Sequence, residues 1–364
     1  MSTLVKKQHI KEIYTKGFEK VLEVIDKDAD LHAFVAIHNT RLGPALGGVR
    51  MYPYRNREEA LYDVLRLASS MTYKFATCGG GFGGGKSVII GDPAKKTKKQ
   101  LLAFGQFVSS LEGKYICAED SGITQEDLSV IREQTPYIVG IMRKGSSGDP
   151  SPFTAFGSYR AIQATCKELF GSDNVRGKTI AIQGLGAVGS KLAKILFWEG
   201  ANLIVSDIHR EKAQEIATLT NAKIVDPIDI LHVECDILSP CAMGAVINEK
   251  TIKLLRCKAI CGCANNLLKE TVDAKTLKRY GILLAPDFIT NSGGAINVYN
   301  ELNKEGYNPT IARDQVSEIY DRILLLYKMA KNKGKSTQEA AYELAEYNVA
   351  NNIGKRKEAV VFHH

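Results

Sequence analysis

The sequence lacks the long apolar runs and leader segments that place a chain in or across a membrane. No apolar run approaches the roughly 20 residues that a bilayer-spanning helix needs. The first residues, MSTLVKKQHIKEIYTKG, lack the apolar core of a secretory signal. With 45% apolar and 24% charged residues in a chain of 364, the composition is that of an ordinary globular protein. We expect a cytoplasmic protein that is long enough for two domains.

The cysteines do not form the patterns that build disulfide scaffolds or metal sites. The chain has eight cysteines and no secretory signal, so we expect buried, reduced thiols. Cys261 and Cys263 are the closest pair, but no C-x-x-C motif or second pair completes the four ligands of a zinc site. We therefore expect no metal.

The charge pattern offers no concentrated patch for a polyanion. The formal net charge is +8, and the basic residues are spread along the chain. The one tight run, KKTKK at residues 95–99, has no interleaved aromatics and favours a solvated loop over a nucleic-acid site. We expect neither a nucleic-acid nor a membrane partner, and a surface suited to small anions such as carboxylates and dinucleotides.

The chain shows no internal repeat, and a turn-rich stretch divides it. Residues 145–152, GSSGDPSP, break the periodicity and mark the first domain boundary. Before this stretch, apolar residues recur at helical spacing over 58–71 and 101–111. Short strands are predicted at 88–90 and 115–118.

Beyond that boundary, strands and helices alternate. This order predicts a parallel sheet with helices on both faces. The strand-like runs are residues 179–183, 202–206, 235–239, 258–262 and 282–285. Two helical stretches, 311–331 and 337–351, close the chain and are expected to pack back on the first domain.

The densest glycine run, CGGGFGGGKS at residues 78–87, matches a phosphate-binding motif only in its letters. Gly80, Gly85, Lys86 and Ser87 satisfy G-x-x-x-x-G-K-[ST]. A triphosphate loop must follow a strand and open a helix. Here a helical pattern precedes the run and a strand follows it. The context therefore argues against an ATP site, and the glycines are expected to let the backbone pass close to another group.

A second glycine motif has the context that the first one lacks. Residues 184–189, GLGAVG, follow a predicted strand and open a helical run over 188–198. Asp207 lies eighteen residues past Gly189, at the end of the next strand, where an acid accepts hydrogen bonds from the adenosine ribose. This pattern predicts NAD, although Arg210 nearby leaves NADP open. The alternative is a glycine turn in an α/β fold that binds no cofactor. The expected cofactor-binding residues are Gly184, Leu185, Gly186, Ala187, Val188, Gly189 and Asp207.

The predicted fold is therefore α/β with two domains. Residues 1–146 form a mixed-sheet α/β catalytic and substrate domain, on which residues 332–364 pack. Residues 147–331 form a Rossmann doubly wound NAD-binding domain.

The first domain offers two lysines and an acid near its glycine-rich segment. Lys74 and Lys86 could divide the work: one ammonium holds a substrate carboxylate, while the other, buried beside a like charge, loses its proton near neutral pH and acts as a base. Asp120 follows a predicted strand. Taken alone, the pattern favours the interpretation that Lys74 and Lys86 are surface residues, as most lysines are.

Short motifs along nearly the whole chain point to one family. They are GPALGGVR at 43–50, MTYK at 71–74, GGGK at 83–86, AED at 118–120, PSPFT at 150–154, ANN at 264–266, APD at 285–287 and NSGG at 291–294. In this order the sequence resembles the Glu/Leu/Phe/Val amino-acid dehydrogenases, and most of all those that act on leucine. Such enzymes convert an L-amino acid, NAD and water reversibly to the 2-oxo acid, ammonia and NADH.

The resemblance implies a role for each matching residue. Lys74 would hold the substrate carboxylate together with the backbone of Gly47. Lys86 would be the general base that activates water, and Asp120 would shuttle protons. Thr154 and Asn265 would line the nicotinamide side, and Asn265 would also contact the substrate.

The side-chain specificity is expected to be apolar. Leu46 stands where the resemblance to glutamate dehydrogenases would place a lysine, so a distal carboxylate would be buried unpaired. Ala118, Ala295 and Val298 complete the expected apolar pocket, and Ala295 departs from the valine of the leucine pattern. We expect a branched-chain substrate. An aromatic substrate (phenylalanine or tryptophan) is the alternative, and a non-catalytic dinucleotide-binding regulator is the alternative from another class. The resemblance also implies a homo-oligomer, an octamer or dimer.

Overall fold

The computed structural model describes residues 8–242 and 244–363, and the chain divides into two compact units. The first unit comprises Met1–Asp149, Val298–Pro309 and Ala345–His364, and the second comprises Pro150–Asn297 and Thr310–Leu344. Residues 1–7 lie outside the described residues. They are part of the segment from which we expected no secretory signal. Within the described ranges, every helix is too short or too polar to cross a membrane.

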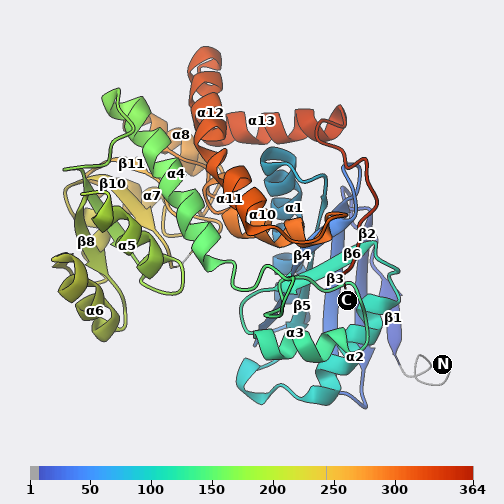
Figure 1. The fold of residues 1–364 in the computed structure, drawn as a ribbon. Helices are drawn as coiled ribbons and strands as arrows, with labels where there is room; N and C mark the ends of the chain where they lie inside the picture. The colour runs from blue at the N-terminus through green and yellow to red at the C-terminus, as the bar shows by residue number, and fades with distance from the viewer. Residues whose placement is uncertain (1–7, 243, 364) are drawn as a thin grey trace. The chain divides into compact units, whose positions relative to one another are not determined.

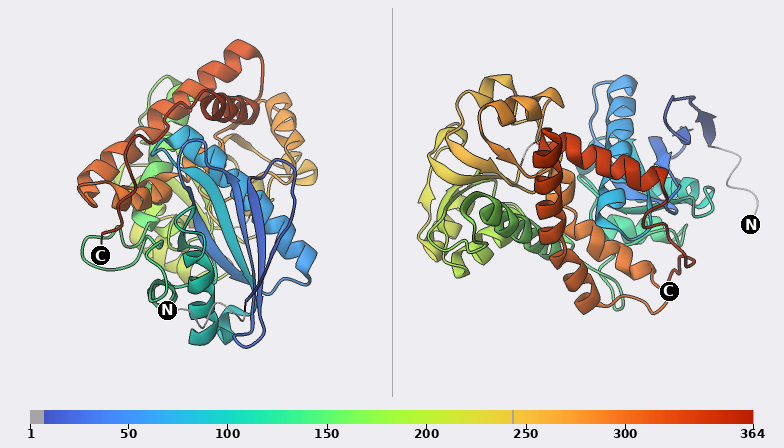
Figure 2. Two further views of the ribbon diagram at one scale, coloured as in Figure 1. Left: turned by 90° about the vertical axis from the view of Figure 1, so that its right-hand side faces the viewer. Right: turned by 90° about the horizontal axis from the view of Figure 1, so that it is seen from above.

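The first unit is built on a mixed sheet, as the sequence predicted. Its strand order is β1-β2-β3-β5-β4-β6. The pairs β1–β2, β2–β3 and β3–β5 are antiparallel, whereas β4 pairs in parallel with both β5 and β6. The blue and cyan strands lie side by side in Figure 2. Their bounds are β1 His9–Glu12, β2 Lys20–Asp26, β3 Leu31–Asn39, β4 Ala45–Tyr52, β5 Gly83–Ile90 and β6 Tyr115–Glu119.

Helices cover both faces of this sheet (Figure 1). Helix α1 (Arg57–Cys78) begins at Asn56, whose side chain accepts a hydrogen bond from the Glu59 amide at 2.8 Å. It ends at Gly79, whose φ of 82° lies in the left-handed region. Helices α2 (Lys98–Ser109) and α3 (Gln125–Arg132) cover the opposite face.

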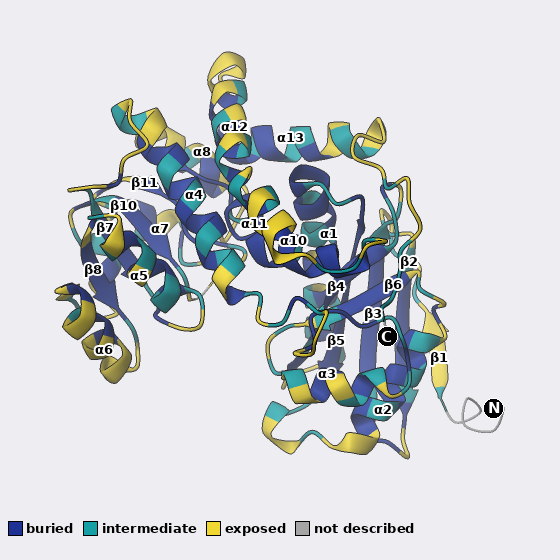
Figure 3. Cartoon of the chain, in the orientation of Figure 1, coloured by how far each residue is buried: buried dark blue, intermediate teal, exposed yellow. Residues whose placement is uncertain are grey.

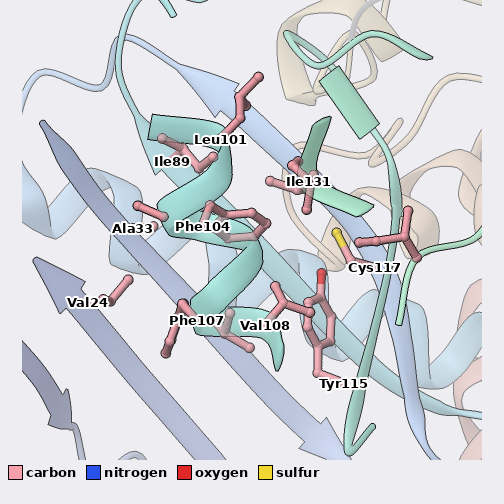
Figure 4. Close-up of a cluster of buried hydrophobic side chains, with 14 of the residues drawn as sticks. Val24, Ala33, Ile89, Leu101, Phe104, Phe107, Val108, Tyr115, Cys117 and Ile131 are labelled. Atoms are coloured by element: carbon pink, nitrogen blue, oxygen red, sulfur yellow. The ribbon is translucent and has the colours of Figure 1, made fainter. Parts of the chain in front are cut away.

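The core of the first unit lies between the sheet and α2. Phe104, Phe107 and Val108 of α2 pack against Val24, Ala33 and Ile89 of the strands and against Ile131 of α3 (Figure 4). Strands β2 to β5 are largely buried, while β1 is exposed along its length (Figure 3). Burial of these apolar side chains stabilises the stack at about 25 cal/mol per Å² removed from water.

The glycine run differs from the prediction in one respect. The strand predicted at residues 88–90 begins at Gly83, so three glycines belong to β5. Glycine has little intrinsic preference for strands; these residues are extended because β3 and β4 pair with them on both sides. The order of a helix before and a strand after the run is as predicted. The triphosphate-loop context is therefore absent.

The second unit contains a doubly wound parallel sheet, which confirms the Rossmann prediction. The strand order β12-β11-β10-β7-β8-β9 is the order that binds dinucleotides at its switch point, between β7 and β10. Strands 179–183 and 202–206 are as predicted, and β9 was not predicted. The bounds are β7 Thr179–Gln183, β8 Asn202–Ser206, β9 Lys223–Ile224, β10 Cys235–Pro240, β11 Cys257–Ile260 and β12 Leu283–Leu284.

Helices connect the strands of the second sheet, and α4, α9 and α10 precede or follow them in the chain. Their bounds are α4 Ser151–Phe170, α5 Gly189–Trp198, α6 Arg210–Thr220, α7 Glu249–Ile252, α8 Val272–Arg279, α9 Asp287–Thr290 and α10 Gly293–Tyr299. The helix expected over 311–331 is two helices, α11 (Pro309–Ser317) and α12 (Ile319–Lys333), and α13 (Thr337–Ala350) is the last.

The units differ from the expected domain bounds in three segments. Residues 147–149, expected with the second domain, lie in the first unit. Residues 332–344, expected with the first domain, lie in the second unit. There the Tyr342 ring stacks on Phe288 at 5.5 Å, and the Thr337 hydroxyl donates to the Leu284 carbonyl at 2.6 Å. Residues 298–309 lie in the first unit, where Tyr299 stacks on Phe82 at 5.9 Å. In residues 298–309 and 332–344, these contacts join residues that are far apart in the chain, and no local sequence pattern predicts them.

The end of the chain does return to the first unit. The Asn348 side chain at the end of α13 donates to the Ala76 carbonyl of α1 at 2.8 Å. Ala345 and Val349 pack with Leu42 and Ala76. This contact anchors the last turn of α13 on α1.

Candidate active site

Three parallel strands bring the catalytic candidates of the first unit together. In the register of the sheet, Val49 of β4 lies between Ser87 of β5 and Glu119 of β6. Lys86 precedes Ser87 and Asp120 follows Glu119, so both fall on the side of the sheet that α1 covers, with Gly48 between them. Side chains alternate between faces along a strand, which fixes this placement.

Lys86 and Asp120 form an ion pair across β4. The Lys86 Nζ contacts Asp120 Oδ2, and both side chains are mostly buried, at 9% and 16% exposure. Gly48 leaves the room for this contact. A Cβ at position 48 would lie 2.9 Å from the Asp120 Cβ and 2.5 Å from the Glu119 carbonyl oxygen. A side chain there would separate the pair.

A second cation faces the same carboxylate. Arg50 Nη2 of β4 lies 3.6 Å from Asp120 Oδ2, and Arg50 Nη1 lies 2.9 Å from Asp63 Oδ2 on α1. The Tyr54 hydroxyl donates to the same Asp63 oxygen at 2.7 Å. Because α1 faces the sheet, its Asp63 can reach Arg50 on β4. Arg50 was not among the predicted site residues.

The charges around Asp120 keep it ionised. Burial by itself would raise the pKa of this carboxyl, but the cations Lys86 and Arg50 outweigh that cost and hold the pKa well below its ordinary value. The Ser121 amide also donates to Asp120 Oδ1 at 2.6 Å. The Cys117 thiol of β6 stays neutral, because burial raises its pKa to about 12.

Helix α1 carries the second candidate lysine. Lys74 and Asp63 are eleven residues apart, about three helical turns, so they lie on the same face of α1. Lys74 is buried at 8% exposure. The helix can approach the strands because β5 carries Gly84 at the crossing, where an added Cβ would lie 2.1 Å from the Thr72 amide nitrogen. Close packing of helix on glycine therefore places a buried lysine over the sheet.

The opposite face of the same strands fixes their spacing. Gly47 packs so tightly that an added Cβ would lie 1.8 Å from the Gly85 carbonyl oxygen. The buried Tyr115 hydroxyl donates to the Gly47 carbonyl at 2.8 Å and lies 2.9 Å from the Ser87 hydroxyl oxygen. These contacts hold β4, β5 and β6 in the register that the ion pair needs.

The apolar candidates occupy different elements. Leu46 of β4 is buried at 2% exposure and lies, like Ala118 of β6, on the face of the sheet that carries Lys86. Val298 packs near Gly140, where an added Cβ would lie 3.5 Å from its Cγ2. Ala295 is half-buried on α10 in the second unit. Leu46 and Ala118 therefore lie on the same face of the sheet as the candidate pair Lys86 and Asp120.

The glycine turn of the second unit has the geometry of a dinucleotide cradle. Gly184 adopts φ of 93° and its amide donates to the Ser206 carbonyl at 2.7 Å. Gly189 packs against the turn, since an added Cβ would lie 2.0 Å from the Gly184 carbonyl oxygen. Gly186 faces open space, with no atom within 4 Å of such a Cβ. Helix α5 starts here, and the open glycine leaves its amino end accessible to a phosphate.

The carboxylate expected to bind ribose closes this turn. Asp207 Oδ2 accepts a hydrogen bond from the Leu185 amide at 2.6 Å, and Oδ1 accepts one from the His209 amide at 2.9 Å. Ala187 and Val188 complete the turn before α5. Arg210 is exposed and pairs with Asp226 at 3.6 Å. The residues present fit a dinucleotide, because a turn, an open glycine and an oriented acid are all in place.

One nicotinamide-side candidate, Asn265, is hydrogen-bonded to Asn291, which was not among the predicted site residues. The buried Asn291 side chain donates to Asn265 Oδ1 at 2.9 Å and to the Cys263 carbonyl at 3.3 Å. Thr154 lies in the first turn of α4, where its hydroxyl donates to the Pro150 carbonyl at 3.1 Å. Asn291 lies in the motif NSGG at 291–294, and this motif was the signal in the sequence that could have identified it as a site residue.

Arg50 and Asp63 were likewise not among the predicted site residues. Arg50 ends the motif GPALGGVR, but nothing in the local pattern of α1 marks Asp63 as its partner. Among the residues that the structure describes, no group of three or more His, Cys, Asp or Glu side chains could hold a metal ion. Seven of the eight cysteines are buried, and Cys241 is half-buried.

Comparisons with known proteins agree with this fold and site. The dimerisation-domain model of Glu/Leu/Phe/Val dehydrogenases matches residues 19–137, and the Glutamate/Leucine/Phenylalanine/Valine dehydrogenase model matches residues 204–360. The chain is 48% identical to a leucine dehydrogenase of Thermoactinomyces intermedius, over 90% of each chain. It is 47% identical to a phenylalanine dehydrogenase of Lysinibacillus sphaericus, over 89% of this chain and 86% of that protein.

A solved structure extends the likeness to three dimensions. The L-tryptophan dehydrogenase of Nostoc punctiforme is 41% identical and superposes with a TM-score of 0.80, over 92% of this chain and 97% of that one. The fold and the site define an oxidoreductase that acts on amino acids. The chain belongs to the Glu/Leu/Phe/Val dehydrogenase family.

Proposed function

We propose that this enzyme catalyses the NAD-dependent, reversible oxidative deamination of a branched-chain L-amino acid, leucine with valine and isoleucine, to the 2-oxo acid, ammonia and NADH. The observation that carries the proposal is the buried ion pair of Lys86 and Asp120 beneath α1, in a chain 48% identical to leucine dehydrogenases. A buried acid–base pair of this kind can hold and move a proton where water is scarce.

The two partners have complementary roles in this proposal. NAD, when bound, supplies the acceptor for the hydride that leaves the α-carbon. Lys86 takes a proton from the water that attacks the imino carbon. Asp120 delivers a proton to the departing nitrogen and accepts one from the developing carbonyl group. Their direct contact supports a proton passing from one partner to the other, because the exchange removes both charges from a poorly solvated site.

Substrate recognition divides into a charged and an apolar part. Lys74 binds the substrate carboxylate with help from the Gly47 backbone, and its burial beside the catalytic strands supports that role. Leu46, Ala118, Val298 and Ala295 receive the apolar side chain, and Asn265 contacts the substrate. No cation stands at Leu46 for a distal carboxylate, which disfavours glutamate.

The cofactor assignment rests on the second unit. We propose that residues 184–189 cradle the pyrophosphate, that Asp207 binds the adenosine ribose, and that Thr154 and Asn265 line the nicotinamide. Asp207 favours NAD over NADP because its carboxylate would repel a 2′-phosphate.

Assembly and location complete the proposal. The match of residues 19–137 to a dimerisation domain supports a homo-oligomer, an octamer or dimer built mainly through the first unit. We place the enzyme in the cytoplasm, where its eight free cysteines would stay reduced. Its partners are then small molecules, without nucleic acid or membrane.

One assay tests the function. The purified protein is mixed with NAD and a panel of L-amino acids, and NADH is followed by absorbance, with NADP as the cofactor control. Oxidation of leucine, valine and isoleucine supports the proposal. Turnover of phenylalanine or tryptophan alone would replace it with the aromatic alternative, consistent with the small Ala295. Absence of turnover with every amino acid, despite bound NADH, would point to a dinucleotide-binding regulator.

A further inference from the structure

Arg50 divides its guanidinium between two carboxylates. Nη1 lies 2.9 Å from Asp63 Oδ2 on α1, and Nη2 lies 3.6 Å from Asp120 Oδ2 at the end of β6. Its side chain is 21% exposed, and those of Asp63 and Asp120 are 17% and 16% exposed. The shorter contact is to the residue that takes no part in the proposed chemistry.

The sheet register dictates this arrangement. Arg50 follows Val49 as Asp120 follows Glu119, and Val49 and Glu119 are paired across β4 and β6. Arg50 and Asp120 therefore point from neighbouring strands to the same side. Asp63 approaches from α1, and the Tyr54 hydroxyl donates to it at 2.7 Å. One planar fork thus links the helix to the strand that ends at the catalytic carboxylate.

We propose that Arg50 is a positioning residue for Asp120, and that Asp63 with Tyr54 anchors Arg50. The inference rests on the proposed function, because it assigns Arg50 through the role of Asp120. With one arm fixed on Asp63, the guanidinium presents its other arm and its charge to Asp120 at a set place. Lys86 is then free to move its proton without releasing the carboxylate from its position.

The same domain contains a comparison pair with a purely architectural geometry. Arg57 of α1 places both Nε and Nη2 on the Glu23 carboxylate of β2, each at 2.7 Å. That fork holds the Glu23 carboxylate with two donors, Nη1 lies 3.7 Å from Glu58 of the same helix, and the group ties α1 to the sheet without reaching Asp120. Arg50 differs because one of its two arms faces Asp120. The two arginines therefore separate positioning from simple attachment of the helix.

The charged and titratable groups facing Asp120 come from three strands and one helix. Arg50 from β4 and Lys86 from β5 are the cations, and both favour the ionised carboxylate. The remaining groups that interact with it electrostatically are Tyr54, Tyr115, Cys117 and Glu119, and Asp63 of α1 faces it through Arg50. Removing Arg50 therefore leaves one cation, and the carboxylate protonates at a higher pH.

The experiment compares substitutions at the two arginine–acid pairs in the full-length enzyme. Arg50→Gln, Arg50→Lys and Asp63→Asn are assayed beside the controls Arg57→Gln and Glu23→Gln. For each variant kcat and KM are measured across pH, with the thermal unfolding midpoint. Arg50→Gln is expected to lower kcat roughly 10- to 100-fold and to move the acid limb of kcat/KM upward by about one pH unit. KM for NAD is expected to stay unchanged.

The other variants keep the test decisive. Arg50→Lys retains the charge and should restore the acid limb while kcat stays low, because an ammonium cannot serve both acids. Asp63→Asn should lower kcat with a smaller shift of the acid limb. It provides the same test if Arg50→Gln fails to fold. Arg57→Gln and Glu23→Gln should lower the unfolding midpoint but leave the pH profile as in the unmodified enzyme.

Two results distinguish failure of this inference from failure of the proposed function. If Arg50→Gln and Asp63→Asn match the Arg57 and Glu23 controls, with an unmoved pH profile and kcat, then Arg50 only attaches the helix and the inference is overturned. If the unmodified enzyme oxidises no amino acid, the proposed function itself fails first. If Lys86→Ala retains full turnover, the function stands but the proposed roles of Lys86 and Asp120 fail, and with them the premise of this inference.

Discussion

Lys86 and Asp120 meet across Gly48, the residue of β4 that stands between them in the sheet. The two partners come from strands that do not pair with each other, and a glycine is the reason that they can touch. An added Cβ at this position would approach the Glu119 carbonyl oxygen to 2.5 Å. The site therefore depends on a missing side chain as much as on the two charged ones.

Gly48→Ala should disable the enzyme while leaving most of the fold intact. The new methyl pushes the backbone after β6 away from Lys86, so kcat/KM should fall roughly 100-fold or more. Steady-state kinetics and a thermal melt check this. Gly91→Ala is the matched control, since its Cβ would meet two side-chain ends, Met51 Cε at 2.7 Å and Gln100 Nε2 at 3.9 Å, and no backbone atom within 4 Å. Equal activity of the two variants would contradict the proposed dependence on Gly48.

Lys86→Ala should remove turnover and spare cofactor binding. Loss of a general base typically costs about 10²- to 10⁴-fold in rate, whereas the dinucleotide cradle belongs to the second unit. Quenching or enhancement of NADH fluorescence gives the dissociation constant, which should match that of the unmodified enzyme. An exposed lysine of the same unit, Lys98, provides the control, and Lys98→Ala should keep full turnover. Substantial activity in Lys86→Ala would remove the mechanism.

Two glycines of the dinucleotide turn should respond differently to alanine. Gly186→Ala meets open space, so the unfolding midpoint should stay the same while NADH affinity falls about 10-fold, or about 1.4 kcal/mol. Gly189→Ala collides with the Gly184 carbonyl oxygen at 2.0 Å and should lower both stability and affinity. Isothermal titration with NADH and a thermal melt separate the two effects. Unchanged affinity in Gly186→Ala would argue against pyrophosphate binding at this turn.

Glu339 should stabilise the second unit only above acidic pH. Hydrogen bonds from the Ser336 hydroxyl and amide, at 2.8 and 3.0 Å, together with Lys275, lower the pKa of Glu339 to about 2. A depressed folded-state pKa gives stability that is present above the unfolded-state pKa and is lost as pH falls through the folded-state value. Glu339→Gln should therefore cost about 1 kcal/mol near neutral pH, because it weakens the cap of α13.

The same substitution should matter progressively less below about pH 4, and its effect should vanish only below about pH 2. Urea unfolding at several pH values measures the difference. Glu318→Gln, which breaks an exposed pair with Arg322, is the control and should change stability by less than about 0.5 kcal/mol at any pH. A constant difference between Glu339→Gln and the unmodified protein down to low pH would show that Glu339 acts through packing alone.

Much of the second unit could be read from the sequence. Strands β7 and β8 begin and end where apolar runs meet glycine and aspartate, and the strand–turn–helix order around Gly184 to Gly189 was enough to predict a dinucleotide turn. The first unit was harder. Gly83 to Gly85 carry no strand signal, and they are extended because β3 and β4 hold them from both sides.

The sequence by itself determined the family, the two α/β sheets and the identity of Lys74, Lys86, Asp120 and Asp207 as candidates, because short motifs and local periodicity record them. Only the tertiary structure decided that Lys86 and Asp120 are partners across Gly48, that Asp63 anchors Arg50, and that residues 298–309 belong with the first unit. These facts depend on strand order and on packing between residues far apart in the chain. A one-dimensional pattern records neighbours along the chain, not neighbours across a sheet.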